Sequence, residues 1–390
     1  MKKLIGAVLV GIGALAITFF YLAPDVIERR FNRITPADYP APSAQVRQLH
    51  AAATVVDLHG DTLMWQRSIL RAAKRGHIDL PRLQQGNVAL QVLSSVTKSP
   101  KGLNYTRNSG DSDSLVGLAI AQLQPPQTWF SPLQRSLWHA RKLAAAQRTS
   151  DQLMMVRSVE DLDRLLQARA GGESLVGTML SIEGLHNLEG DRDNLQRLFD
   201  AGFRMAGLTH FFDNRVAGSM HGVNKGGLTE FGTQVVADMQ QLGMIIDLAH
   251  LSPAAIDDVL KLATRPVVVS HGGVQALCDV NRNLNDDQIR RIAATGGVIG
   301  IGYWSGAVCG TSPDNVAAAM KHVRDLVGAQ HVALGSDFDG AVQVSFDTSQ
   351  LVLVTDALRR AGFSEPEITA ALGGNALRVL RATLPSATAP

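Results

Sequence analysis

Side chains of the types that bind metal ions follow six separate apolar runs in this 390-residue chain. They are His59, Asp61, Glu183, His210, His250, His271 and Asp337. Imidazole nitrogens combined with carboxylate oxygens, with no thiolate among them, favour Zn²⁺, and Mn²⁺ and Fe²⁺ are the alternatives. A single histidine at the end of a strand is more often a satisfied polar residue, so a metal site is expected only if the fold brings the set together.

The spacing of these residues suggests a site for two ions. His59 and Asp61 are alternate residues of an extended segment, so they point to the same side and can bind one ion. His250 and His271 follow neighbouring apolar runs and can bind a second ion. Glu183 is the natural bridge, because a carboxylate can offer one oxygen to each metal. Two ions ~3.5–4 Å apart would share a water, lower its pKa and polarise a carbonyl, so we expect hydrolysis through a metal-bridging water.

Three further residues have side chains that suit the rest of such a reaction. His210 could donate a hydrogen bond to the oxyanion of a tetrahedral intermediate. Asp337 could take the proton from the bridging water and pass it to the leaving amine. Arg282 has a guanidinium that suits bidentate capture of a substrate carboxylate, although from the sequence alone an ordinary surface arginine is the commoner case.

Eight short apolar runs, which alternate with longer amphipathic stretches, must position these side chains. Most of the runs are continuously apolar, which is typical of parallel strands buried on both faces. They cover residues 54–58, 88–93, 176–182, 204–209, 244–248, 266–270, 298–303 and 332–335. The pattern predicts a (β/α)₈ TIM barrel of the metal-dependent hydrolase type, whose strands end at one common mouth. A doubly wound sheet is the alternative, but it would normally carry a glycine-rich phosphate loop where His59-Gly60-Asp61 stands.

The long connection between residues 94 and 177 is expected to be an excursion from the barrel. It contains helical patterns near residues 131–147 and 159–168. Functional insertions on barrels commonly take this form.

The N-terminus departs from the rest of the chain in composition. Lys2 and Lys3 precede an apolar run over residues 4–23, which is long enough to cross a bilayer core of about 30 Å as a helix. We therefore expect residues 1–33 to be a transmembrane anchor that can be deleted to leave a soluble, active enzyme. A cleaved signal peptide is the alternative, although residues 19–24 make a poor cleavage site.

The remaining boundaries follow from proline content and polarity. Residues 34–50 are expected to form an extended linker, because Pro36, Pro40 and Pro42 disfavour a helix. Residues 51–384 then form the catalytic barrel, and the small, polar tail 385–390 is expected to fray. Net charge is +2 and no dense basic cluster occurs, so we expect no nucleic acid as a partner.

Several stretches of the chain match one known family. They read Val-Asp-Leu-His59-Gly-Asp61-Thr, His77-Ile-Asp-Leu-Pro-Arg-Leu, Ser-Ile-Glu183-Gly-Leu-His, Gly-Leu-Thr-His210, Gly-Leu-Thr-Glu-Phe-Gly, Asp-Leu-Ala-His250-Leu-Ser, Pro-Val-Val-Val-Ser-His271, Asn-Arg282-Asn283 and Gly-Ser-Asp337-Phe-Asp-Gly. On these motifs the chain resembles the membrane (renal) dipeptidases, peptidase family M19, from about residue 54 to residue 380. Any one of the motifs would be weak, but together they are highly specific.

The resemblance implies a barrel enzyme with two Zn²⁺ per chain that hydrolyses dipeptides, including those with a C-terminal D-residue. It implies that the metal ligands are His59, Asp61, Glu183, His250 and His271, with Glu183 bridging. It assigns substrate binding and catalysis to His210, Arg282 and Asp337, together with Glu183. The loop after His210 and the insertion around residues 98–128 depart from the mammalian enzymes, so substrate preference does not follow from the resemblance.

The resemblance also suggests a disulfide between Cys278 and Cys309, whereas composition alone gives a free pair as the default. A disulfide would fit a compartment outside the cytosol. We therefore expect a bacterial-type inner-membrane protein with its catalytic domain on the periplasmic side, or an exported protein after signal cleavage. A small dipeptide is the expected substrate, and a homodimer is left open.

Two other functions are weighed against a dipeptidase. One is a related two-metal amidohydrolase acting on another amide, such as a β-lactam or an N-acyl D-amino acid. The other is a non-catalytic, membrane-tethered binding protein on a barrel scaffold, which would be expected to lack part of the ligand set.

Overall fold

A computed structural model describes the backbone of residues 2–387 and the side chains of residues 3–5 and 18–387. Eight parallel strands form a closed barrel, because β3 pairs with both β2 and β5 while β10 pairs with both β9 and β2. The barrel strands are β2 (Val55–Asp57), β3 (Val88–Val96), β5 (Val176–Glu183), β6 (Phe203–Gly207), β7 (Ile245–Asp247), β8 (Val268–Val269), β9 (Val298–Ile301) and β10 (Val332–Leu334). All eight predicted strands and the predicted barrel are thus confirmed.

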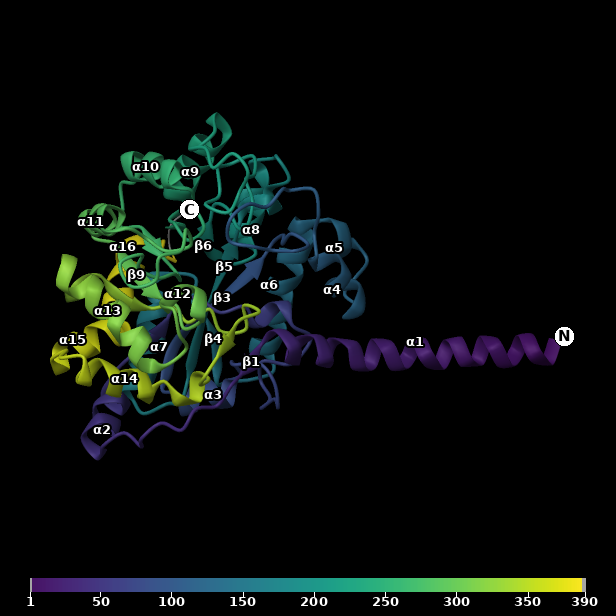
Figure 1. Ribbon diagram of the computed structural model, residues 1–390, viewed down its shortest axis with the longest axis horizontal. Helices are drawn as coiled ribbons and strands as arrows, with labels where there is room; N and C mark the ends of the chain where they lie inside the picture. Colours follow the sequence, from purple (N-terminus) through teal and green to yellow (C-terminus); the bar gives the residue numbers. More distant parts are fainter. Residues whose placement is uncertain (1, 388–390) are drawn as a thin grey trace.

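Helices surround the barrel (Figure 1). They are α2 (Ala44–Ala52), α3 (Leu80–Gln85), α4 (Leu115–Ala121), α5 (Gln127–Phe130), α6 (Pro132–Arg148), α7 (Val159–Ala170), α8 (Asp193–Asp200), α9 (Glu230–Leu242), α10 (Pro253–Leu262), α11 (Asp286–Ala294), α12 (Ser305–Val308), α13 (Pro313–Val327), α14 (Val352–Arg360), α15 (Glu365–Thr369) and α16 (Asn375–Thr383). Local sequence explains their ends: Ser252 caps α10 by accepting from the backbone of Ala255, and Gly243 ends α9 with φ of 70°.

The excursion between β3 and β5 contains the two predicted helices, as α6 and α7. It also contains a short strand that the sequence did not predict, β4 (Leu153–Met155), which pairs with residues 176–178 at the start of β5. A second unpredicted pairing joins β1 (Arg33–Ile34) to β11 (Gln343–Val344).

The N-terminal segment forms the long helix α1 (Lys2–Phe31), which projects from the barrel in Figure 1. The side chains of residues 6–17, the centre of the expected anchor, lie outside the described part. Among the described residues, no helix has both the length and the apolar character that spanning a membrane requires. The expected extended linker over residues 34–50 is wrong at both ends, because β1 and α2 are regular elements. Ser43 caps α2, and the prolines all precede this helix, so they do not interrupt it.

The C-terminal tail is anchored further than its composition predicts. Pro385 accepts a hydrogen bond of 3.1 Å from the backbone of Val159, and Ser386 donates one of 2.7 Å to Glu160. The expected fraying is therefore wrong for residues 385–387, because α7 supplies partners for them. Residues 388–390 lie outside the described part of the chain.

Candidate metal centre

The register of the barrel aligns the strand ends that carry the candidate residues. Glu183, the last residue of β5, pairs with Gly207 of β6, and Gly207 pairs with Asp247 of β7. His210 and His250 follow these strands by three residues. The mouth of the barrel therefore collects side chains from segments that are far apart in the sequence.

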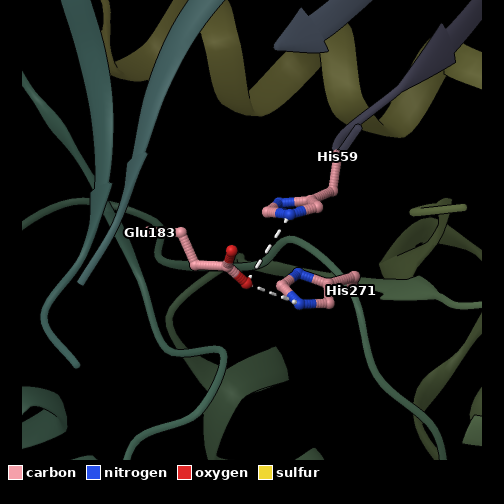
Figure 2. Close-up of side chains that lie close together, drawn as sticks. All are labelled: His59, Glu183 and His271. Carbon is pink, nitrogen blue, oxygen red and sulfur yellow. Dashed lines mark ion pairs between the residues drawn. The ribbon is translucent and has the colours of Figure 1, made fainter. Parts of the chain in front are cut away.

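One oxygen of Glu183 is the centre of this collection. Its Oε1 lies 3.0 Å from Nε2 of His250, 3.3 Å from Nε2 of His271, 3.6 Å from Nε2 of His210 and 3.7 Å from Nε2 of His59. Figure 2 shows the imidazoles of His59 and His271 converging on this carboxylate. All of these residues are buried, and the structure brings them together at one place instead of leaving them as separate polar residues.

The carboxylates of Asp61 and Asp337 lie on the His59 side of the site. Nε2 of His59 is 3.6 Å from Oδ1 of Asp61 and 3.8 Å from Oδ1 of Asp337. Three overlapping groups could each hold an ion: one of His59, Glu183 and His271, one of Glu183, His210 and His250, and one of His59, Asp61 and Asp337. The geometry thus brings all of these residues together. His210 and Asp337, which were expected to act on the substrate, lie as close to Glu183 and His59 as the expected metal ligands do.

A layer of buried hydrogen bonds fixes the imidazole rings. Ser270 donates to Oδ2 of Asp247 at 2.5 Å, so its oxygen can accept from Nδ1 of His271 at 2.9 Å and from Nδ1 of His59 at 3.3 Å. In its neutral form each of these two rings then presents the lone pair of Nε2 to the centre, as metal-binding histidines do. Neither Ser270 nor Asp247 was predicted from the sequence, although both lie within three residues of a candidate histidine.

His210 is oriented by the insertion that follows β3. Its Nδ1 donates to the carbonyl of Lys98 at 2.9 Å, which leaves Nε2 facing Glu183. In the neutral ring Nε2 can only accept, so donation to an oxyanion requires the imidazolium form.

Two candidates have left-handed backbones, which residues other than glycine rarely adopt: φ is 65° at His250 and 59° at Asp337. Each such residue costs of order 1 kcal/mol and is found mostly at functional sites.

Burial and mutual charge shift the pKa values of these groups strongly. Burial lowers the pKa of His59, but Asp61, Glu183 and Asp337 outweigh it and raise that pKa to about 10. Burial and the charge of Glu183 raise the pKa of Asp61 to about 6. Burial also raises the pKa of Asp337. Burial alone would raise the pKa of Glu183 too, but the surrounding histidines outweigh it and keep that pKa well below its ordinary value. The crowded carboxylates of this site therefore favour the presence of additional positive charge. Bound protons supply that charge when no metal cation is present.

Unpartnered polar atoms give separate evidence that these side chains suit metal ions. Nε2 of His59 and Oδ1 of Asp61 are buried and have no hydrogen-bond partner, and buried polar atoms normally have one. Nε2 of His250 lies only 3.1 Å from Nε2 of His271. Two lone pairs at that distance repel unless a proton or cation lies between them.

The site opens into a cavity of about 780 Å³, whose lining includes Asp61, Glu183, His210, His250, His271, Arg282 and Asp337. Arg282 is buried and lines this cavity, so it is not the ordinary surface arginine that the sequence alone favoured. This position suits the substrate-binding role that the family resemblance implied. Its Nη2 donates to the carbonyl of His271 at 3.0 Å, and its guanidinium lies 5.6 Å from the ring centre of Trp304. Trp304 donates to Tyr105 at 2.7 Å, and both aromatic residues line the cavity without having been singled out in the sequence.

The two cysteines lie close to this arginine. Cys278 and Cys309 form the disulfide that the resemblance suggested. Asn283 donates to the carbonyl of Cys278 at 2.8 Å and to that of Ala307 at 3.0 Å. The disulfide and this asparagine therefore hold together the loop that carries Arg282.

Comparisons with known proteins identify the family to which the chain belongs. The family model described as membrane dipeptidase (Peptidase family M19) matches residues 43–388. Dipeptidase verJ of Clonostachys rogersoniana is 29% identical over 317 residues, which are 80% of this chain and 76% of that protein. An uncharacterized dipeptidase of Schizosaccharomyces pombe, C965.12, is 27% identical over 355 residues, which are 85% of this chain and 80% of that one.

Solved structures share the fold. A metallo peptidase from Rhodobacter sphaeroides, liganded with a phosphinate mimic of the dipeptide L-Ala-D-Ala, has a TM-score of 0.70 at 24% identity, covering 85% of this chain and 99% of that one. The probable dipeptidase PvdM from Pseudomonas aeruginosa has a TM-score of 0.72 at 20% identity, covering 87% of this chain and 98% of that one. With a barrel mouth that gathers the family's motifs and a family model that spans the whole barrel, this chain is a peptidase and belongs to the membrane dipeptidase family, peptidase family M19.

Proposed function

We propose that this protein is a zinc-dependent dipeptidase that holds two Zn²⁺ and accepts dipeptides with a C-terminal D-residue. The observation that carries the proposal is the convergence of four imidazole Nε2 atoms within 3.7 Å of one oxygen of Glu183, at the inner end of a cavity that also contains Arg282. His59, Asp61, Glu183, His250 and His271 would hold the ions, with Glu183 shared. When bound, the ions lower the pKa of a water and polarise the scissile carbonyl.

The chain's own residues would bind the dipeptide and move its protons. Arg282, whose guanidinium lies beside His250 and His271, would pair with the free carboxylate of the substrate. Asp337 lies next to His59 and lines the cavity, so it would accept a proton from the attacking water and return it to the leaving amine. His210 would donate to the oxyanion when it carries a proton on both ring nitrogens.

Tolerance of a D-residue is supported by the crystal structure of the Rhodobacter sphaeroides metallo peptidase, whose ligand mimics L-Ala-D-Ala. The test is hydrolysis of a matched panel of L-L and L-D dipeptides by the zinc-loaded protein, alongside its metal content. Two equivalents of zinc and turnover of both L-Ala-L-Ala and L-Ala-D-Ala are expected. Turnover of β-lactams or N-acyl D-amino acids without turnover of any dipeptide would favour the amidohydrolase alternative.

We also propose that the chain is held at an inner membrane by its N-terminal segment, with the barrel on the periplasmic side. The apolar run over residues 4–23 and the disulfide support this location. Fractionation of cells that express the full chain, with protease added to intact spheroplasts, tests it. Protection of the barrel from the protease would contradict the proposed side.

A further inference from the structure

The last two turns of α1 form part of the cavity that leads to the candidate metal centre. Ile27 and Phe31 are four residues apart, so they lie on the same face of the helix. Both line the cavity, and both are apolar. The neighbouring part of the wall is also apolar and comes from Met64, Trp65, Leu115 and Leu118.

This apolar wall is only partly covered. Ile27 packs against the cluster of Met64, Trp65 and Leu115 and is half-buried. Phe31 remains 49% exposed although it lines the cavity. A large aromatic side chain that is left half-covered inside a cavity offers contact area to an apolar group of a ligand.

The end of α1 is fastened to the barrel rather than loosely tethered. Glu28 is buried, and it accepts hydrogen bonds from Nε of Arg67 at 2.6 Å and from Nε of Arg75 at 2.7 Å. Asn32 accepts from the backbone of Ala341 at 2.9 Å, and β1 continues the attachment by pairing with β11. The position of the apolar wall is therefore fixed with respect to the metal centre.

The barrel order places this wall across the mouth from Arg282. The loop that carries Arg282 follows β8, whereas Leu115 shares a packed cluster with Val96, the last residue of β3, which lies four strands away in the barrel of eight. Met64 follows β2, and Ala341 follows β10. If Arg282 binds the free carboxylate of a dipeptide, the residue at the other end of that dipeptide extends toward the α1 wall.

We propose that Ile27 and Phe31 form a specificity pocket that receives the side chain of the N-terminal residue of the substrate and favours large apolar side chains there. This inference rests on the proposed dipeptidase function, because that function sets the direction in which the substrate lies. It assigns to the end of the N-terminal helix a part in substrate selection in addition to any part in membrane attachment.

The test compares kcat/KM for Leu-Ala, Phe-Ala and Gly-Ala with the zinc-loaded, full-length protein and its Ile27→Ala and Phe31→Ala variants. In each variant, kcat/KM for Leu-Ala or Phe-Ala divided by kcat/KM for Gly-Ala is expected to fall by about tenfold. This is the usual effect of lost apolar contact in a substrate pocket. The Gly-Ala rate itself should change little, because glycine makes no contact with the wall. Val26→Ala is the matched control, since Val26 lies on the same helix, is 60% exposed and does not line the cavity.

A second substrate series separates the two ends of the dipeptide. Ala-Gly, Ala-Leu and Ala-Phe vary the C-terminal residue, and their ratios should stay unchanged in both variants. Unchanged ratios in the first series, or a change confined to the second, would overturn the assignment. Absence of any dipeptide turnover in the wild-type protein would instead refute the proposed function. Phe31→Leu, which keeps an apolar side chain, should retain most of the preference if Phe31→Ala does not fold.

Discussion

Glu28, in the last turns of the N-terminal helix, is bound by Arg67 of the loop after the first barrel strand, at 2.6 Å and out of contact with water. Arg67 also pairs with Asp339, which lies two residues beyond Asp337. The end of the helix is thus connected to the loop that carries a candidate catalytic carboxylate.

This connection predicts different results for two truncations. Deletion of residues 1–23 should leave a folded, active enzyme, whereas deletion of residues 1–33 should lower the free energy of unfolding. The expected loss is about 3 kcal/mol, at the low end for a broken buried ion pair because Asp339 remains beside Arg67. Urea denaturation measures it, and Glu28→Gln in the shorter truncation should reproduce most of the loss. Equal stability of both truncations would show that the helix end contributes nothing to the fold.

Removal of metal should abolish activity. Dialysis against a chelator is expected to leave less than about 1% of kcat/KM, because the uncatalysed attack of water lacks the metal's lowering of its pKa. Added Zn²⁺ should restore activity with a stoichiometry of two per chain, measured by elemental analysis. Full activity in metal-free protein would end the argument for a metal centre.

Zinc binding should release protons at neutral pH. With a pKa of about 10, His59 carries a proton at pH 7 in the metal-free protein, and a metal ion must displace it. The raised pKa of His59 stabilises the metal-free fold below pH 6.5, and that contribution is lost as the pH rises toward 10. Apparent zinc affinity should therefore increase by up to about tenfold per pH unit across this window for each proton released.

Calorimetry in two buffers of different ionisation enthalpy counts these protons. His59→Asn should bind zinc more weakly and release one proton fewer. The same proton count in the wild-type protein and in this variant would mean that another group holds the displaced proton.

Arg282→Ala should lower kcat/KM for dipeptides on the order of 100-fold, the usual cost of truncating one partner of a buried charge pair. Arg282→Lys should recover part of the loss, because lysine keeps the charge without the bidentate geometry. Dipeptide amides, which have no free carboxylate, should be hydrolysed equally by the wild type and by Arg282→Ala. Equal losses for acids and amides would indicate that Arg282 supports the fold of the site instead.

Loss of the disulfide should affect substrate binding more than turnover. The closed loop has a sequence separation of 31 residues, for which chain entropy predicts a stability loss of roughly 3–4 kcal/mol. Since this loop carries Arg282, replacing Cys278 and Cys309 by serine should raise KM for dipeptides while kcat changes little. Unaltered KM and stability would show that the hydrogen bonds of Asn283 suffice to hold the loop.

The sequence alone was enough to predict the barrel strands and the set of side chains that the structure brings together at the barrel mouth. Continuous apolar runs mark strands buried on both faces, and parallel strands in a barrel must end at one mouth. Residues that follow such runs, including Glu183 and His250, therefore converge whatever the connecting segments do. Local sequence also explains the helix ends at Ser252 and Gly243, because such ends depend on neighbours within a few residues.

Only the tertiary structure decided which side chains complete the site. The docking of Glu28 on Arg67, the place of Phe31 in the cavity wall and the contact of Ser270 with Asp247 join segments with no shared periodicity. Arg282, which composition assigns to the surface, is buried within the loop that the Cys278–Cys309 disulfide closes. Such contacts are set by how the loops pack above the barrel, and loop packing depends on shape and pairing between distant residues that no local pattern encodes.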